Sequence, residues 1–131
     1  VYNVGHYERT NYGSDKHQNQ CQDIHIYETE EQGSSSLVEV TPKPTLAEGI
    51  AIGKPARAGE VLDMIRRHNV KVITAPEDRI LPCREEMAKR GFYVEHTTAA
   101  ALAAYYRYCE KFGPTEDALL SLCGAGLKSE H

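Results

Sequence analysis

The chain has 131 residues, of which 40% are hydrophobic and 26% charged, and its formal net charge is −4. This length and composition fit one globular domain with a buried core, residues 1–131, and exclude a disordered or fibrous chain. The charge is uneven, because residues 1–45 hold 3 basic and 7 acidic residues (net −4) whereas residues 46–131 hold 12 of each (net 0). No basic stripe with interleaved aromatic residues is present, which argues against nucleic acid as a partner.

Localisation and redox state follow from two further features of the composition. No apolar run approaches the length of a membrane span, and the first residues lack the parts of a secretory leader, so we expect a cytoplasmic protein with no membrane contact. The cysteines show neither a CxxC pair nor a zinc-like spacing with histidine, so we expect reduced thiols and no metal site. They are Cys21, Cys83, Cys109 and Cys123.

The first third of the chain gives weak structural signals. Residues 1–22 are polar and aperiodic, apart from a short strand-like opening. Residues 23–30, DIHIYETE, alternate apolar and polar side chains as a half-covered strand does. Residues 37–40, LVEV, are a brief strand candidate, and TPKPT at 41–45 is an extended connector because its prolines cannot join a helix interior.

Helical periodicity begins after this connector. Val61, Leu62 and Ile65 are three and four residues apart, which predicts a helix over residues 58–68 with one apolar stripe. Residues 71–74, KVIT, are a candidate for a buried strand.

A second helix is predicted from its end signals. Thr74 to Glu77, TAPE, has the form of a capping box, and Gly91 after Arg90 is a typical C-terminal stop. Pro82 lies inside this helix, where it removes a backbone hydrogen bond, so we expect a kink or a late start.

A third helix follows a short extended segment, FYV at 92–94, and runs from Thr97 or Thr98 to Lys111. Its inward stripe is predicted to consist of Ala99, Leu102, Ala103, Tyr106 and Cys109. Residues 118–122, ALLSL, form a last apolar strand candidate that leads directly into Cys-Gly-Ala-Gly. Strands alternating with helices indicate an α/β fold with a mainly parallel sheet and flanking helices.

Ligands in such folds lie beyond the carboxyl ends of strands, where loops lead into helices. Residues 95–98, Glu-His-Thr-Thr, have this character, since Thr97 or Thr98 could cap the helix and its free amides would suit an anion or an electron-rich ring. An ordinary helix cap beside a solvated acid explains the same residues and is the commoner arrangement.

Two other stretches are candidates for a site. Cys123 directly follows the apolar run of 118–122, and the glycines after it allow the backbone to approach a ligand closely. A buried thiol before a turn is the plainer interpretation. In AEGIAIGKP, residues 47–55, Glu48 and Gly49 precede a short apolar run, and a simple loop would account for them.

Taken together and in this order, TLAEGIAIGKP, GFYVEHTTAAALAA and LLSLCGAGLK resemble the carboxyl-terminal third of the fold-type II pyridoxal-phosphate-dependent enzymes. This group includes threonine synthase, threonine and serine dehydratases and cysteine synthase, and the match is most similar to threonine synthase. It covers residues 45–128, and DIHIYETE resembles a family strand more weakly. The resemblance implies a partial fold-type II domain, similar to the tryptophan synthase β-like fold, and leaves residues 1–22 poorly matched.

The resemblance also implies roles for individual residues around pyridoxal 5′-phosphate. Cys123, followed by Gly124, stands where the family places the hydrogen-bonding partner of the pyridine nitrogen. A neutral partner there favours β-elimination and β-replacement chemistry. Glu95 and Thr97 match the acid and hydroxyl that line the same end of the cofactor. Glu48 and Gly49 match the loop near the edge of the cofactor ring.

The chain departs from the family pattern in two respects. His96 stands where the family has proline, which would either only loosen the turn or add a titratable group beside Glu95. The family's Schiff-base lysine and its substrate-carboxylate loop are missing from this sequence, and residues 4–13, VGHYERTNYG, keep one glycine of the phosphate-binding loop without the glycine run. None of the lysines has the context of a Schiff-base residue; they are Lys16, Lys43, Lys54, Lys71, Lys89, Lys111 and Lys128.

Two interpretations remain open. In the first, the chain is a fragment or truncated relative of a threonine synthase-like lyase that acts on a small amino acid; it carries one wall of the cofactor site, is inactive alone and does not hold the cofactor by itself. In the second, it is a non-catalytic α/β binding or self-association module built on that scaffold. In both, surfaces facing the missing half need cover, which predicts a homo-oligomer or a partner that supplies the amino-terminal half.

Overall fold

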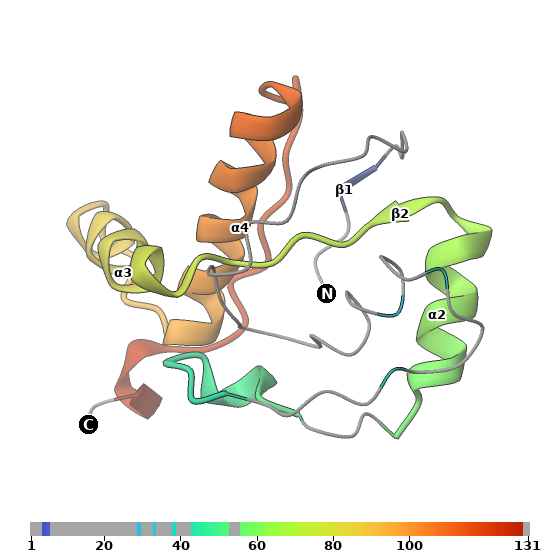
Figure 1. Cartoon of the computed structure of the whole chain (residues 1–131). Coiled ribbons are helices and arrows are strands. Elements are labelled where there is room, and N and C mark those ends of the chain that lie inside the picture. Colours follow the sequence, from blue (N-terminus) through green and yellow to red (C-terminus); the bar gives the residue numbers. More distant parts are fainter. Residues whose placement is uncertain are drawn as a thin grey trace.

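The computed structural model describes residues 4–5, 29, 33, 38, 43–52 and 56–129 of the chain. Its elements are β1 (Val4–Gly5), η1 (Glu48–Ile50), α2 (Ala58–Arg67), β2 (Val70–Lys71), η2 (Glu77–Arg79), α3 (Ile80–Lys89), α4 (His96–Phe112) and η3 (Gly126–Ser129). Figure 1 shows α3 and α4 side by side, with α2 at the opposite side of the molecule. An extended segment that includes β2 leads from α2 toward α3. No helix in the described part of the chain is long and apolar enough to cross a membrane.

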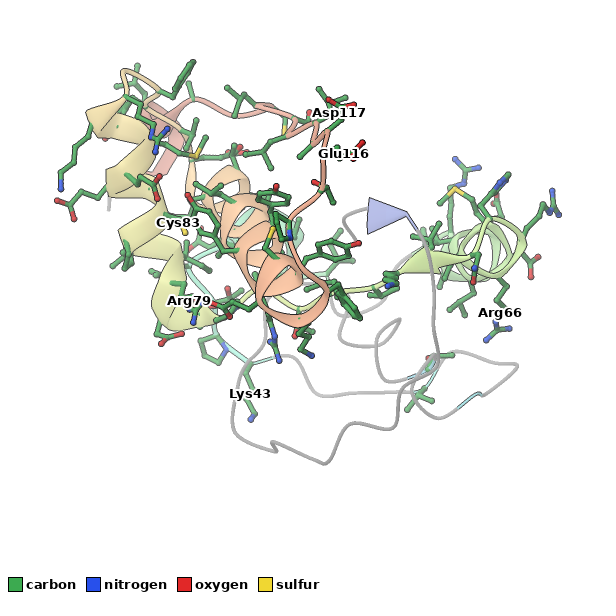
Figure 2. The ribbon with its side chains drawn as sticks, turned by 90° about the horizontal axis from the view of Figure 1, so that it is seen from above. Lys43, Arg66, Arg79, Cys83, Glu116 and Asp117 are labelled. Carbon is green, nitrogen blue, oxygen red and sulfur yellow. The ribbon has the colours of Figure 1, made fainter. Side chains whose placement is uncertain are left out.

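The main core lies between α3 and α4. Ile80 and Cys83 of α3 face Ala99 and Ala103 of α4, and all four side chains are buried. Figure 2 shows Cys83 on the α4 side of α3. Leu102, Tyr106 and Cys109 are only partly buried against the same core. The predicted inward stripe is therefore confirmed in part, because α4 also buries residues outside it: Ala100, Ala101, Ala104 and Tyr108. Short alanine side chains let the neighbouring elements pack closely against this helix.

A second cluster forms around α2, which ends one residue earlier than the predicted helix. Leu62 and Ile65 of α2 pack against Val70 of β2. β2 pairs with β1 in antiparallel register, with Val4 opposite Lys71. The predicted strand over 71–74 is therefore present only at its first residue, because no other described strand pairs with the rest.

The start of α3 corrects one prediction and confirms another. The capping box at Thr74–Glu77 is wrong, because the chain first forms the 3-10 turn η2 and no side chain caps it. α3 begins only at Ile80, which places Pro82 in its first turn. The missing amide of Pro82 costs little there, since the first amides of a helix have no intrahelical partner. Gly91 adopts a φ of 89° just after the helix, as expected of a stop.

The start of α4 also differs from the prediction. Its N-cap is Glu95, and neither Thr97 nor Thr98 caps the helix with its side chain. Both threonines lie inside the first turn, and Thr98 is 1% exposed. The helix ends at Phe112, and the next residue, Gly113, has a φ of 85°, which is readily reached only by glycine.

The predicted strand at 118–122 is wrong in this structure. These residues form no strand, Leu119 is fully exposed and Leu122 is 48% exposed, since no described strand lies beside them to supply hydrogen bonds. The segment instead returns along α4, and Leu120 packs against the main core (Figure 1). The only strand pair among the described residues is antiparallel, so the parallel sheet stays a prediction.

The predictions for the first third lie mostly outside the described residues. This applies to the loop of 1–22 beyond β1, to the strand at 23–30 apart from Thr29, and to the strand at 37–40 apart from Val38. Thr29 is helical and buried, which contradicts a strand at that residue. Its hydroxyl accepts a hydrogen bond from the Val38 amide at 2.8 Å.

Candidate functional site

The three stretches singled out in the sequence meet at the start of α4. The first contact joins η1 to the helix: a methyl group added to Gly49 would lie 2.9 Å from Oγ1 of Thr97. Only a glycine lets η1 approach this hydroxyl so closely. Glu48, the residue before it, is exposed on the same turn.

The second contact joins the N-cap of α4 to the glycines near the carboxyl end. Val94 and Ala125 form an isolated antiparallel bridge. The amide of Glu95 donates to the carbonyl of Gly124 at 3.0 Å, and the amide of Gly126 donates to the carbonyl of Tyr93 at 2.9 Å. These bonds fix Glu95 beside Gly124 along the backbone.

Cys123 completes the arrangement. Cys123 is exposed, and its Sγ atom lies 3.9 Å from Oγ1 of the buried Thr98. A thiol is a weak hydrogen-bond donor, so an exposed thiol supported by a hydroxyl can meet an acceptor that approaches from outside. The structure thus brings five of the six residues predicted for one side of a cofactor to the start of α4, and Glu48 is the exposed neighbour of one of them, Gly49. Their role in binding stays a prediction.

The turn that carries Gly49 is held in place by Glu77. One carboxylate oxygen of Glu77 accepts from the Thr45 hydroxyl at 2.8 Å, and the other accepts from the Leu46 amide at 2.6 Å. Ala47, the next residue, is completely buried in the main core. The acid that sequence analysis assigned to a capping box therefore anchors the loop before η1.

Arg84 is a central residue of this region that sequence analysis missed. From α3, its Nε donates to the carbonyl of Val94 at 2.9 Å and its Nη2 donates to the carbonyl of Gly126 at 3.1 Å. Nη2 also donates to the Tyr93 hydroxyl at 3.2 Å, and the guanidinium carbon lies 4.9 Å from the centre of the Tyr93 ring. A single side chain thus contacts both strands of the bridge.

His96 joins the same network. Its Nε2 lies 3.3 Å from Nη1 of Arg84, which can donate to a neutral imidazole but not to an imidazolium. The imidazole of His96 is therefore part of the hydrogen-bond network around Arg84.

The hydrogen-bonding groups around Cys123 suit the ring-nitrogen side of pyridoxal phosphate that the resemblance implies, but in the described part of the chain Lys71 and Lys89 are engaged in other contacts. Nζ of the buried Lys71 lies 3.7 Å from the centre of the Phe112 ring, at the far end of α4. With 1.5 Å of rise per residue, that end is roughly 20 Å from the first turn of the helix. Lys89 pairs with Glu85 at 2.7 Å.

The other thiols and acids do not form a competing site in the described part of the chain. Burial raises the pKa of the Cys83 thiol to about 11, so it is protonated and unreactive at neutral pH. Among the described residues, no group of three or more His, Cys, Asp or Glu side chains could hold a metal ion.

A cleft of about 260 Å³ lies between α3, α4 and the segment 118–122. Its walls are mainly apolar, and they include Phe92 and Leu122. Two polar groups of the cleft wall pair with each other: the Tyr106 hydroxyl lies 2.9 Å from both carboxylate oxygens of Glu86 and donates to this carboxylate. Burial and this carboxylate raise the pKa of Tyr106.

Comparison with known protein families gives a match over most of the chain. The family model described as pyridoxal-phosphate dependent enzyme matches residues 15–124, a range that includes η1, the start of α4, Cys123 and Gly124. No curated protein and no solved structure matches the chain significantly.

Proposed function

The chain belongs to the pyridoxal-phosphate dependent enzyme family, whose domain implies an α/β fold, and from this premise we propose that it forms the pyridine-ring wall of a cofactor site. We further propose that it is a fragment or truncated relative of a threonine synthase-like lyase, which the resemblance of the three ordered motifs supports. The observation that carries the proposal is the meeting of those motifs: Gly49 with Thr97, Glu95 with Gly124, and Thr98 with Cys123.

In this proposal, Cys123 contacts the pyridine nitrogen, and Thr98 orients its thiol. Glu95 and Thr97 line the same end of the ring, while residues 48–49 border its edge. The bound cofactor would stabilise negative charge at the reacting carbon of a small amino acid. The lysine and the substrate-carboxylate loop come from outside this sequence, so the chain alone is expected to be inactive.

The wall can be tested without the missing lysine by titrating the chain with pyridoxine 5′-phosphate, which lacks the reactive aldehyde. The chain alone is not expected to retain the cofactor, but weak binding of the ring to one wall at high ligand concentration should change the amide NMR signals of Thr98, Cys123 and Gly124. Cys123→Ser should keep these changes, because a hydroxyl can take the place of the thiol, whereas Cys123→Val should abolish them. Cys109→Ser, on the distal half of α4, is the matched control. Unchanged signals at all three residues would refute the wall.

The need for an outside lysine has a separate test. The chain is mixed with pyridoxal phosphate, reduced with borohydride and analysed by mass spectrometry. We expect scattered, substoichiometric labelling of exposed lysines. A stoichiometric adduct on one lysine would show that the chain holds the cofactor itself, and would contradict this part of the proposal.

A second candidate function, a non-catalytic self-association module, is supported by the exposed leucines. Leu119 is fully exposed and Leu127 is 74% exposed, although both are apolar. Such side chains usually mark a surface that another protein covers. Sedimentation velocity over a range of concentrations tests this candidate, with Leu119→Ser expected to shift the chain toward monomer. A monomer at every concentration would exclude self-association.

A further inference from the structure

We propose that Arg84 is the positioning residue that holds the two strands of the cofactor wall in register. The inference concerns the same wall and, for the ligand, rests on the proposed function. The geometry of the wall itself does not depend on a ligand.

The first argument is which groups the guanidinium binds. It donates to the carbonyl of Val94, directly before Glu95, and to the carbonyl of Gly126, two residues after Gly124. These carbonyls belong to opposite strands of the Val94–Ala125 bridge. Among the described residues this bridge belongs to no longer strand ladder, and two backbone bonds accompany it, Glu95 to Gly124 and Gly126 to Tyr93. A side chain that binds both strands therefore contributes substantially to holding them together.

The second argument is how Arg84 differs from the neighbouring cations. Arg79 and Arg90 pair with the carboxylates of Glu110 and Glu86 at the surface, where ion pairs contribute little. Among the described ion pairs, Arg84 has no carboxylate partner. Its donors are instead directed at two carbonyls, the Tyr93 hydroxyl and the His96 ring, which is the arrangement of a structural clamp.

The third argument is the shape of the side chain. A guanidinium presents several donors in one rigid plane, and the Tyr93 ring lies 4.9 Å from its centre. A lysine ammonium has neither the planar array of donors nor the flat face of a guanidinium. It could bind one of the two carbonyls but could not make all the contacts of Arg84. Arg84→Lys therefore separates the role of geometry from the role of charge.

Amide hydrogen exchange tests the proposal directly on the chain. In Arg84→Met, protection of the Glu95 and Gly126 amides should fall by about tenfold or more relative to Ala103 within α4, as expected from losing charge-assisted hydrogen bonds. Added methylguanidinium should restore part of this protection in Arg84→Gly. Ile65→Ala, in the cluster around α2, is the control for global destabilisation and should lower the protection of all three amides together.

The outcomes separate clearly. Equal loss at Glu95, Gly126 and Ala103 in the Arg84→Met protein, or no loss at all, would overturn the proposal. If Arg84→Met does not fold, Arg84→Lys decides, because wild-type protection at both bridge amides in that variant would also overturn it. Selective loss of protection in a chain that never binds pyridoxine 5′-phosphate would support the clamp and refute the proposed cofactor wall.

Discussion

The side chain of Glu95 lies directly against the α-carbon of Gly124, so closely that an added methyl group would be 1.9 Å from its Cδ. Because the obstructing atoms are the far end of a flexible side chain, Gly124→Ala can be accommodated by rotation of Glu95. We expect a loss of less than about 1 kcal/mol in the free energy of unfolding, together with a displaced carboxylate. Denaturant titration measures the first effect, and the carboxyl ¹³C signal of Glu95 measures the second.

Gly126 provides the contrast and Gly59 the control for this prediction. A methyl group on Gly126 would lie 2.7 Å from ring atoms of Tyr93, which is also held by Arg84. A ring cannot yield as a carboxylate does, so Gly126→Ala should cost about 1–3 kcal/mol. Gly59→Ala, in open space on α2, should stabilise the chain by about 0.5–1 kcal/mol. A larger cost at Gly124 than at Gly126 would contradict the argument.

The contact between Gly49 and Thr97 predicts coupling between η1 and α4. Gly49→Ala should lower the free energy of unfolding by about 1 kcal/mol, because its methyl group would meet the Thr97 hydroxyl at 2.9 Å. Thr97→Ala removes this obstruction, so the double variant should be more stable than additivity predicts by about 0.5–1 kcal/mol. A double-mutant cycle by denaturant titration measures this difference, and strict additivity would show that the two elements do not touch.

Burial of Cys83 predicts a loss of stability in alkali. Its folded pKa is raised from 9.0 to about 11, mainly by desolvation. Above about pH 9 the unfolded chain therefore loses this proton first, and the free energy of unfolding falls as the pH rises toward 11. Thermal denaturation across this range measures the slope. Cys83→Ala should flatten it in part, since the raised pKa of Tyr106 acts in the same direction.

Cys109→Ala is the control for the alkaline prediction, because Cys109 lies on α4 and is only partly buried. In the Cys109→Ala protein, the free energy of unfolding should fall with pH as steeply as in the unchanged protein. If both alanine variants retain the full slope, burial of Cys83 does not cause the loss.

The helix ends were predicted better than the helix starts, because the capping box before α3 and the threonine caps of α4 were wrong. Pro82 and Gly91 fix the limits of α3, since the first cannot lie in a helix interior and the second readily adopts a positive φ. The strand at 118–122 could not be judged in this way, because a strand depends on a neighbour that the local sequence does not specify. Leu119 is exposed for this reason, despite a pattern typical of a buried strand.

The candidate site was predicted from motif order rather than from contacts. The motifs indicated Glu95, Gly124 and Cys123, and the backbone bond from Glu95 to Gly124 brings these residues to one place. Arg84 was missed because its neighbours in α3 are charged and it looked like one more solvated cation. Its spacing held the signal, since it follows Ile80 by four residues and precedes Met87 by three, which places it beside the buried face.

Glu77 offers the sharpest test of how the wall is assembled. Its carboxylate binds the Thr45 hydroxyl and the Leu46 amide, and so holds the loop that leads to Gly49. Glu77→Ala should cost about 1–3 kcal/mol and lower the hydrogen-exchange protection of the Ile50 amide, because both donors lose a charged acceptor. Asp78→Ala, with the same change in charge at an exposed neighbour, should leave that amide unchanged. If the two variants behave alike, the effect is one of net charge, and the loop is held by the burial of Ala47 instead.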